Sequence, residues 1–263
     1  MNFRASRFLL AWFATGLALL GLAACSSTSG PPHPLVVSGH PDWPPVMFRD
    51  GNSIDGIGPA LAKMICDDLD IPAEFVYAGQ WDEVQAKARA GNVDMLVAAY
   101  KTTARLEYYD YTEAYVMDPL ALFVRRGHEF TFAKYEDLLG KKGVGTVGDS
   151  YGQEFDNYIN TRLDFKRVVT AKEALDLVAG GQADYFVYSL YSGHEELKSE
   201  QREAQFAALP HFIAEEPFYF AISKKSPYRA YVPAINRLID QYKADGTIDK
   251  LIAQYKARFH LNP

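Results

Sequence analysis

The sequence VDMLVAAYKTTAR at residues 93–105 decides how the rest of the chain folds. Its centre, residues 95–99, is a continuous apolar run, which is typical of a strand buried on both faces of a parallel sheet. Two hydroxyl residues, Thr102 and Thr103, and then Arg105 follow at the carboxyl end of this strand, where open α/β sheets bind ligands. The guanidinium of Arg105 can bind a carboxylate through two parallel hydrogen bonds. The segment fits equally well an ordinary surface arginine that begins a helix with a threonine as its N-cap.

Strands and helices alternate on the N-terminal side of this run. Residues 35–38 and 75–77 have the composition of short strands, and residues 58–69 and 81–90 carry apolar stripes at helical spacing. The order strand, helix, strand, helix, strand favours a parallel-rich sheet with right-handed crossovers. We therefore predict an α/β fold.

The same pattern restarts after a second apolar run at residues 119–124. We predict three more strands and two more helices, in chain order at residues 142–147, 152–161, 167–169, 170–179 and 184–188. Thr170 and Glu173 form a capping box at the start of the second of these helices. The two halves of the chain share this rhythm without clear sequence repetition.

A strand at residues 218–223 and two amphipathic helices complete the predicted fold. Ser226-Pro227 supplies an N-cap followed by proline at the first helical position, and Gly246 ends that helix. Thr247 is the predicted N-cap of the last helix.

The first residues of the chain have the layout of an export signal. Residues 1–24 contain Arg4 and Arg7, followed by a nearly uninterrupted apolar run. The sequence Leu22-Ala23-Ala24-Cys25 resembles a bacterial lipobox, which implies cleavage before Cys25 and lipidation of its thiol. In Gram-negative lipoproteins, a residue other than aspartate after the cysteine, here Ser26, implies sorting to the outer membrane. The alternative is a plain signal peptide with an incidental cysteine.

Composition excludes several classes of partner. The net charge is -6 and becomes -8 without residues 1–24, which hold two arginines and no acid, so no basic patch is available for nucleic acid. If Cys25 is lipidated, Cys66 is the only thiol left and no intrachain disulfide can form. We see no Cys/His cluster with metal spacing and expect neither a metal nor a cofactor. Residues 25–34 are rich in Ser, Gly and Pro and form a predicted tether.

The sequence RLEYYDYTEAY at residues 105–115 resembles the stretch that follows the ligand-binding arginine in the type 3 family of bacterial solute-binding proteins, the polar amino acid binders of ABC transporters. The resemblance runs from about Leu35 to the C-terminus. It implies a periplasmic-binding-protein-like type II fold, in which two βαβ lobes are joined by a two-segment hinge with the ligand cleft between them. The implied division is residues 35–119 with 217–263 in one lobe and residues 120–216 in the other.

The resemblance also implies the residues that bind the ligand. Arg105 would hold the ligand carboxylate from the first lobe, and Ser150, with the backbone N–H groups of its turn, would meet it from the second. An aromatic residue that packs on the ligand stands at Trp43. The full set of expected ligand-binding residues is Arg105, Ser150, Trp43, Thr102, Thr103, Tyr100, His40, Asp149 and Ser189. Alternatives remain open: Ser150 as an N-cap that touches only its own helix, and Trp43 as a cover for the core.

Three positions depart from the pattern of the family's amino acid binders. Ser189 stands where a carboxylate usually holds the ligand ammonium, His40 replaces an acidic residue, and Gly56-Ile57-Gly58 replaces a Gly-aromatic-Asp motif. A desolvated ammonium group without a carboxylate would be costly. The residues that could substitute are Asp42, Asp118 and Asp149, and the aromatic residues expected near the cleft are Trp43, Tyr100, Tyr151, Tyr185, Tyr188 and Tyr191.

These features lead to one functional hypothesis and two alternatives. The chain is expected to be a periplasmic lipoprotein, anchored to the inner leaflet of a Gram-negative outer membrane, that captures a small carboxylate-bearing solute for an ABC-type importer. We expect a monomer whose partners are the solute and an inner-membrane permease or sensor. The alternatives are an enzyme resembling cyclohexadienyl dehydratases, and a sensing or accessory binding protein without a permease.

Overall fold

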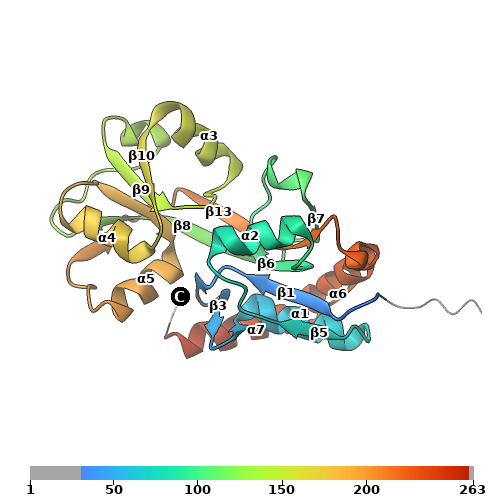
Figure 1. The fold of residues 1–263 in the computed structure, drawn as a ribbon. Helices are drawn as coiled ribbons and strands as arrows, with labels where there is room; N and C mark the ends of the chain where they lie inside the picture. Colours follow the sequence, from blue (N-terminus) through green and yellow to red (C-terminus); the bar gives the residue numbers. More distant parts are fainter. Residues whose placement is uncertain (1–30, 261–263) are drawn as a thin grey trace, which may run out of the picture. The chain divides into compact units, whose positions relative to one another are not determined.

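The computed structural model describes residues 31–260. Its main feature is a ten-stranded sheet with the order β10-β9-β11-β8-β13-β6-β1-β5, in which β12 also pairs with β8 and β7 with β13 (Figure 1). These strands are β1 (Leu35–Gly39), β5 (Ala73–Phe75), β6 (Met95–Ala99), β7 (Tyr109–Tyr111), β8 (Val116–Arg125), β9 (Lys142–Thr146), β10 (Asp164–Val168), β11 (Tyr185–Ser189), β12 (Phe206–Ala208) and β13 (Ala214–Ser223).

The helices pack against this sheet. They are α1 (Ile57–Asp68), α2 (Trp81–Ala90), α3 (Gln153–Arg162), α4 (Ala171–Ala179), α5 (Leu190–Ser199), α6 (Val232–Ala244) and α7 (Thr247–Arg258), with short 3-10 helices at Arg105–Glu107, Tyr135–Leu138 and Pro227–Tyr231. Helix α2 contacts β1 and β6, α4 contacts β9 and β11, and α7 packs against α1 and α6. We call the half with β1, β5, β6 and these C-terminal helices lobe 1, and the half with β9, β10, β11 and α3 to α5 lobe 2.

Strands β8 and β13 connect the two lobes. Residues 116–120 of β8 pair antiparallel with residues 214–218 of β13. Beyond this linking segment, β8 continues into lobe 2 and pairs there with β11. Strand β13 continues into lobe 1 beside β6 (Figure 1). The chain therefore passes between the lobes along two paired strands. The expected boundaries at Pro119 and Pro217 lie in this segment, and the exact division stays a prediction.

The strongest sequence patterns gave the right elements. The strand at Met95–Ala99 and the helix at Trp81–Ala90 lie where the sequence predicted them. Other elements were missed because they are short: β7, β12 and the small sheet β2-β3-β4 (Asp42–Trp43, Met47–Asp50 and Ser53–Asp55) have two to four residues each. Helix α5 was also missed, since a serine and a glycine interrupt its pattern.

Of two predicted helix starts, the one at Ser226-Pro227 begins a 3-10 helix instead of α6 itself, and the one at Thr247 was wrong. Ser226 accepts a hydrogen bond from the Tyr228 N–H and caps only the 3-10 helix, and α6 begins separately at Val232. Pro233 has no N–H to donate, so the hydrogen-bond pattern is reset there. The N-cap of α7 is Gly246, in a left-handed conformation with φ +76°, and Thr247 is already helical.

Among the described helices, none is both long enough and apolar enough to cross a membrane.

An irregularity in β6 shapes the segment that leads to Arg105. Ala98 has a φ of +58°, and the pairing of β6 with β13 shifts register beside it. A left-handed conformation is costly for a residue with a Cβ atom, so neighbouring groups must hold it. The Ala98 N–H donates to the Tyr115 hydroxyl at 3.0 Å, and both residues are buried. A Cβ atom at Gly58 would lie 2.7 Å from the same hydroxyl, which explains why this position has no side chain.

We predict that Tyr115→Phe lowers the free energy of unfolding by about 1 to 3 kcal/mol, because the buried Ala98 N–H loses its acceptor. Urea denaturation measures the change. Tyr108→Phe is the matched control, since this tyrosine is 42% exposed and its hydroxyl makes no hydrogen bond within the described residues. Equal stability of the two variants would contradict the role given to Tyr115.

Candidate ligand-binding site

A small cavity lies where the chain leaves β6 and β9. Its volume is about 20 Å³, which is enough for roughly one water molecule. It is lined by His40, Trp43, Trp81, Ala98, Tyr100, Arg105, Asp149, Ser150 and Phe218. Six of the nine residues predicted to bind ligand are in this lining, and Thr102, Thr103 and Ser189 are not. We call this space the inner cavity.

Arg105 spans the two lobes at the inner cavity. One terminal nitrogen of its guanidinium donates to the Tyr100 carbonyl oxygen and the other to the Gly148 carbonyl oxygen, both at 3.0 Å. The guanidinium carbon also lies 5.4 Å from the ring centroid of Trp81. A guanidinium has five N–H donors, so these two bonds leave donors for a ligand.

Thr102 and Thr103 support this turn and do not line the cavity. The Thr102 hydroxyl oxygen accepts from the Arg105 N–H at 3.3 Å, as a capping threonine does. Thr103 is exposed, and its N–H donates to the Gln153 side-chain oxygen of lobe 2 at 2.8 Å. Neither hydroxyl lines the inner cavity, and the contact of both with ligand stays a prediction.

Ser150 lines the inner cavity, but its hydroxyl is directed to its own lobe. It donates to one carboxylate oxygen of Asp156 at 2.5 Å, and the Tyr151 N–H donates to the other at 2.9 Å. Asp156 lies in the first turn of α3, whose N-cap is Gly152. The Ser150 hydroxyl thus contacts its own helix, as in the alternative considered for it, although the N-cap is Gly152 and not Ser150. A ligand carboxylate would have to take these two donors from Asp156.

A fully buried carboxylate, that of Asp118, lies in the linking segment beside the cavity wall. It accepts hydrogen bonds from the Trp43 indole at 3.0 Å, from the Ser189 hydroxyl at 2.7 Å and from the Tyr100 hydroxyl. Ser189 therefore has a carboxylate beside it that comes from a different strand, and Ser189 itself is enclosed. The sequence signal was an acid directly before the apolar run at residues 119–124.

Burial governs the ionisation of this group. It raises the pKa of Asp118 from its ordinary value to about 6, although the hydrogen bonds from Tyr100, Ser189 and Trp43 act in the opposite direction. Burial and the neighbouring Asp118 charge raise the pKa of Tyr100 well above its usual range, so the phenol keeps its proton.

His40 and Asp149 lie next to each other in the lining of the inner cavity. The Asp42 N–H donates to Nδ1 of His40 at 3.0 Å, and the other ring nitrogen, Nε2, is directed to Asp149. That nitrogen lies 3.3 Å from Oδ1 of Asp149. The other carboxylate oxygen of Asp149 accepts from the Thr146 hydroxyl.

Aromatic rings form the remaining walls. Trp43 lies 4.7 Å from Tyr188 and 4.9 Å from His40 between ring centroids, and Tyr100 stacks on Phe218 at 4.5 Å. Trp43 therefore covers the core and lines the cavity at once. Phe218 was not identified from the sequence, and Trp81 was assigned only to the core-facing side of its helix. The predicted aromatics Tyr151, Tyr185 and Tyr191 do not line the inner cavity.

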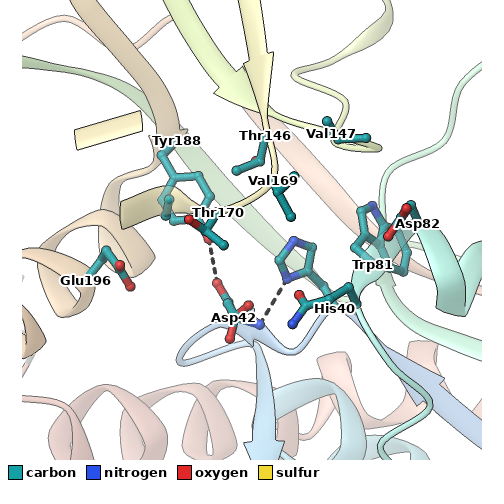
Figure 2. A pocket seen from close by; sticks show the side chains of 12 residues that line it. His40, Asp42, Trp81, Asp82, Thr146, Val147, Val169, Thr170, Tyr188 and Glu196 are labelled. Atoms are coloured by element: carbon teal, nitrogen blue, oxygen red, sulfur yellow. Dashed lines mark hydrogen bonds between the residues drawn. The ribbon is translucent and has the colours of Figure 1, made fainter. Parts of the chain in front are cut away.

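A larger cavity of about 220 Å³ adjoins the first and shares His40 and Trp81 with it (Figure 2). It is lined by His40, Asp42, Gln80, Trp81, Asp82, Thr146, Val147, Val169, Thr170, Ala171, Tyr188 and Glu196. The Tyr188 hydroxyl donates to the Asp42 carbonyl oxygen at 2.7 Å across it. We call it the outer cavity. Within residues 31–260 no cluster of three or more His, Cys, Asp or Glu side chains is arranged to hold a metal ion.

The raised pKa of Asp118 predicts a pH-dependent stability. The folded protein holds this proton more tightly than the unfolded chain does, so the contribution is present at low pH and is lost as the pH rises from about 4 to about 6. Relative to Asp118→Asn, the wild type should lose on the order of 3 kcal/mol of unfolding free energy across this range. Urea denaturation of both proteins between pH 4 and pH 7 measures the difference.

The control for this experiment is Asp240→Asn, which removes an exposed carboxylate on α6. A difference between wild type and Asp118→Asn that stays constant over the whole pH range would show that Asp118 is ionised as readily in the folded protein as in the unfolded chain.

Comparison with known proteins identifies the family. The family model "Bacterial extracellular solute-binding proteins, family 3" matches residues 35–258. A Vibrio harveyi protein, PatH, whose name describes an amino-acid ABC transporter-binding protein, is 24% identical over 246 residues, which are 93% of this chain and 96% of PatH.

Solved structures share the fold. A mutant of the T. maritima protein ArgBP superposes with a TM-score of 0.70 at 22% identity, over 85% of this chain and 95% of that one. A histidine kinase sensor domain with similarity to periplasmic binding proteins gives a TM-score of 0.71 at 22% identity, over 84% of this chain and 95% of that one. The predicted α/β, type II periplasmic-binding-protein-like fold is confirmed. The chain belongs to family 3 of the bacterial extracellular solute-binding proteins.

Proposed function

We propose that this protein captures a small carboxylate-bearing solute, an amino acid or a related organic acid, outside the cytoplasm and presents it to an ABC-type importer. The observation that carries the proposal is the position of Arg105. Its guanidinium lies at the carboxyl end of β6, lines the inner cavity and reaches Gly148 of lobe 2. A ligand carboxylate bound there would contact both lobes, so binding and closure would be coupled.

Solute binding requires the lobes to separate first. The inner cavity has room for about one water molecule, which is too little for an amino acid. Besides that of Arg105, the hydrogen bonds that join the two sides of the cleft include four between neutral groups: Thr103 to Gln153, Gln85 to Gly148, Ser192 to the Pro44 carbonyl oxygen, and Tyr188 to the Asp42 carbonyl oxygen. These neutral bonds are individually modest, about 0.5 to 1.5 kcal/mol each, so a hinge at the linking segment could open them.

A binding role is favoured over an enzymatic one by the environment of Asp118. Its raised pKa would suit a proton donor, but the carboxylate is fully enclosed and lines neither cavity. Three side chains donate hydrogen bonds to it. A substrate could not reach it without displacing Trp43 and Tyr100. We therefore propose no chemical step.

Names of relatives agree with an amino acid as the solute: PatH is named for amino-acid binding. The proposal further places the mature chain in the periplasm, as a monomer anchored by a lipid on Cys25. Cys25 lies outside the described residues. The proposed division into lobes is residues 35–119 with 217–263, and residues 120–216.

Replacement of Arg105 should show whether it binds the solute. A thermal-shift screen of amino acids, polyamines, dicarboxylates and aromatic acids identifies a ligand, since a ligand that binds only the folded state stabilises it. Calorimetry should then show a loss of about 2 to 5 kcal/mol of binding free energy for Arg105→Ala, because the ligand anion is left unpaired. Arg105→Lys keeps the charge without the planar fork and should recover only part of the loss.

Two further variants give reference values for the loss of binding free energy. Ser150→Ala should cost about 0.5 to 1.5 kcal/mol, as expected for one neutral hydrogen bond. Arg89→Ala is the control, because Arg89 is an exposed arginine on α2 that forms no salt bridge within the described residues. Unchanged affinity in Arg105→Ala, with the fold intact by circular dichroism, would place the site elsewhere or show that the solute is not an acid.

The lipid anchor has its own test. Mass spectrometry of protein purified from native membranes should show an N-terminal peptide that begins at Cys25 and carries two or three acyl chains. An unmodified peptide that begins at another residue would reject the anchor.

A further inference from the structure

One buried oxygen in the inner cavity has no hydrogen-bond donor among the described residues. It is Oδ1 of Asp149, whose side chain is 2% exposed. His40 Nε2 lies 3.3 Å away without forming a hydrogen bond. Buried polar atoms are nearly always paired, so an unpaired carboxylate oxygen in a cavity wall indicates a missing partner. That partner must be a donor, and a cation would satisfy it best.

Arg105 does not supply this partner. It forms no ion pair with Asp149, although it donates to the carbonyl oxygen of Gly148, the preceding residue. The inner cavity is therefore lined by one cation and one anion that are not paired with each other. A zwitterion would pair with both charges, its carboxylate with Arg105 and its ammonium with Asp149. This assigns the pairing with the ligand ammonium group to Asp149, in the loop after β9. Ser189 has no charge and cannot take this role.

The lining of the outer cavity also favours a positively charged group. Its acidic lining residues, Asp42, Asp82 and Glu196, come from three different elements and no lysine or arginine is in the lining (Figure 2). Burial, and then the charges of Asp42 and Glu200, raise the pKa of Glu196. Burial and the neighbouring negative charges thus destabilise the ionised form of Glu196, and a cation bound in the cavity would stabilise it. Because the outer cavity adjoins the inner one at His40 and Trp81, a ligand can extend from one into the other.

We propose that the solute is an α-amino acid with a positively charged side chain. Its α-ammonium group pairs with Asp149, and its side chain lies in the outer cavity, among the three acids. The inference rests on the proposed function and names the class of solute for the same site.

Matched ligands test both charges on the unaltered protein. Calorimetry compares L-arginine with L-citrulline, and L-lysine with L-norleucine; each pair differs chiefly in the charge at the end of the side chain. The cationic member of at least one pair should bind at least about tenfold more tightly, as for loss of a charge-assisted bond. The 2-hydroxy acid analogue of the tighter ligand, which lacks the α-ammonium group, should be weaker by a similar factor.

Variants then assign the charges to residues. Asp149→Asn keeps an acceptor for Thr146 and should weaken the cationic amino acid about tenfold or more while changing its 2-hydroxy analogue by less than about threefold. Glu196→Gln should narrow the preference for the cationic over the neutral member of the pair. Asp240→Asn, which removes an equal charge at a distant surface, should change neither quantity.

The outcomes separate this inference from the proposed function. Arg105-dependent binding of neutral and cationic amino acids with equal affinity would overturn the inference and leave the proposed function intact. Equal weakening of the amino acid and its 2-hydroxy analogue by Asp149→Asn would overturn the role of Asp149. Failure of every acid in the screen to bind would overturn both.

Discussion

The buried carboxylate of Asp118 is the contact on which the geometry of the site depends. It lies in the linking segment between the lobes and accepts hydrogen bonds from Trp43, Tyr100 and Ser189. Two of these donors are aromatic walls of the inner cavity, and the third ends β11 of lobe 2. A buried charge that loses its partners costs several kcal/mol, so the three side chains are held in place whenever Asp118 is ionised. The floor of the cleft is thereby fixed relative to the strands that join the lobes.

Charge distribution explains why the cavity suits a solute with both signs of charge. Arg105 and Asp149 line the same small space, and each is held by groups of its own surroundings, the carbonyl oxygens of Tyr100 and Gly148 and the hydroxyl of Thr146. Neither neutralises the other. A bound zwitterion would satisfy both groups and would replace the direct bonds between the lobes with bonds through the ligand, which is how solute binding can stabilise a closed form.

Local sequence patterns were sufficient for the fold and for part of the site. The apolar run at Met95–Ala99 predicted the central strand, and Tyr100 and Arg105, which follow it, line the inner cavity. The partners of these residues could not be predicted, because they depend on contacts distant in sequence: Asp118 meets Trp43 across 75 positions, and Arg105 meets Gly148 across 43. The hydroxyls of Thr102, Thr103 and Ser150 were expected to contact the ligand. In the structure the Thr102 hydroxyl accepts from the Arg105 N–H, the Ser150 hydroxyl donates to Asp156, and Thr103 is exposed.

A crystal structure of the protein with the tightest ligand from the screen would test most directly whether the inner cavity is the solute site. We predict a ligand carboxylate within hydrogen-bond distance of the Arg105 guanidinium, with the cavity enlarged between β6 and the loop after β9. A ligand bound away from Arg105, with the guanidinium still bonded only to the Tyr100 and Gly148 carbonyl oxygens, would contradict the assignment.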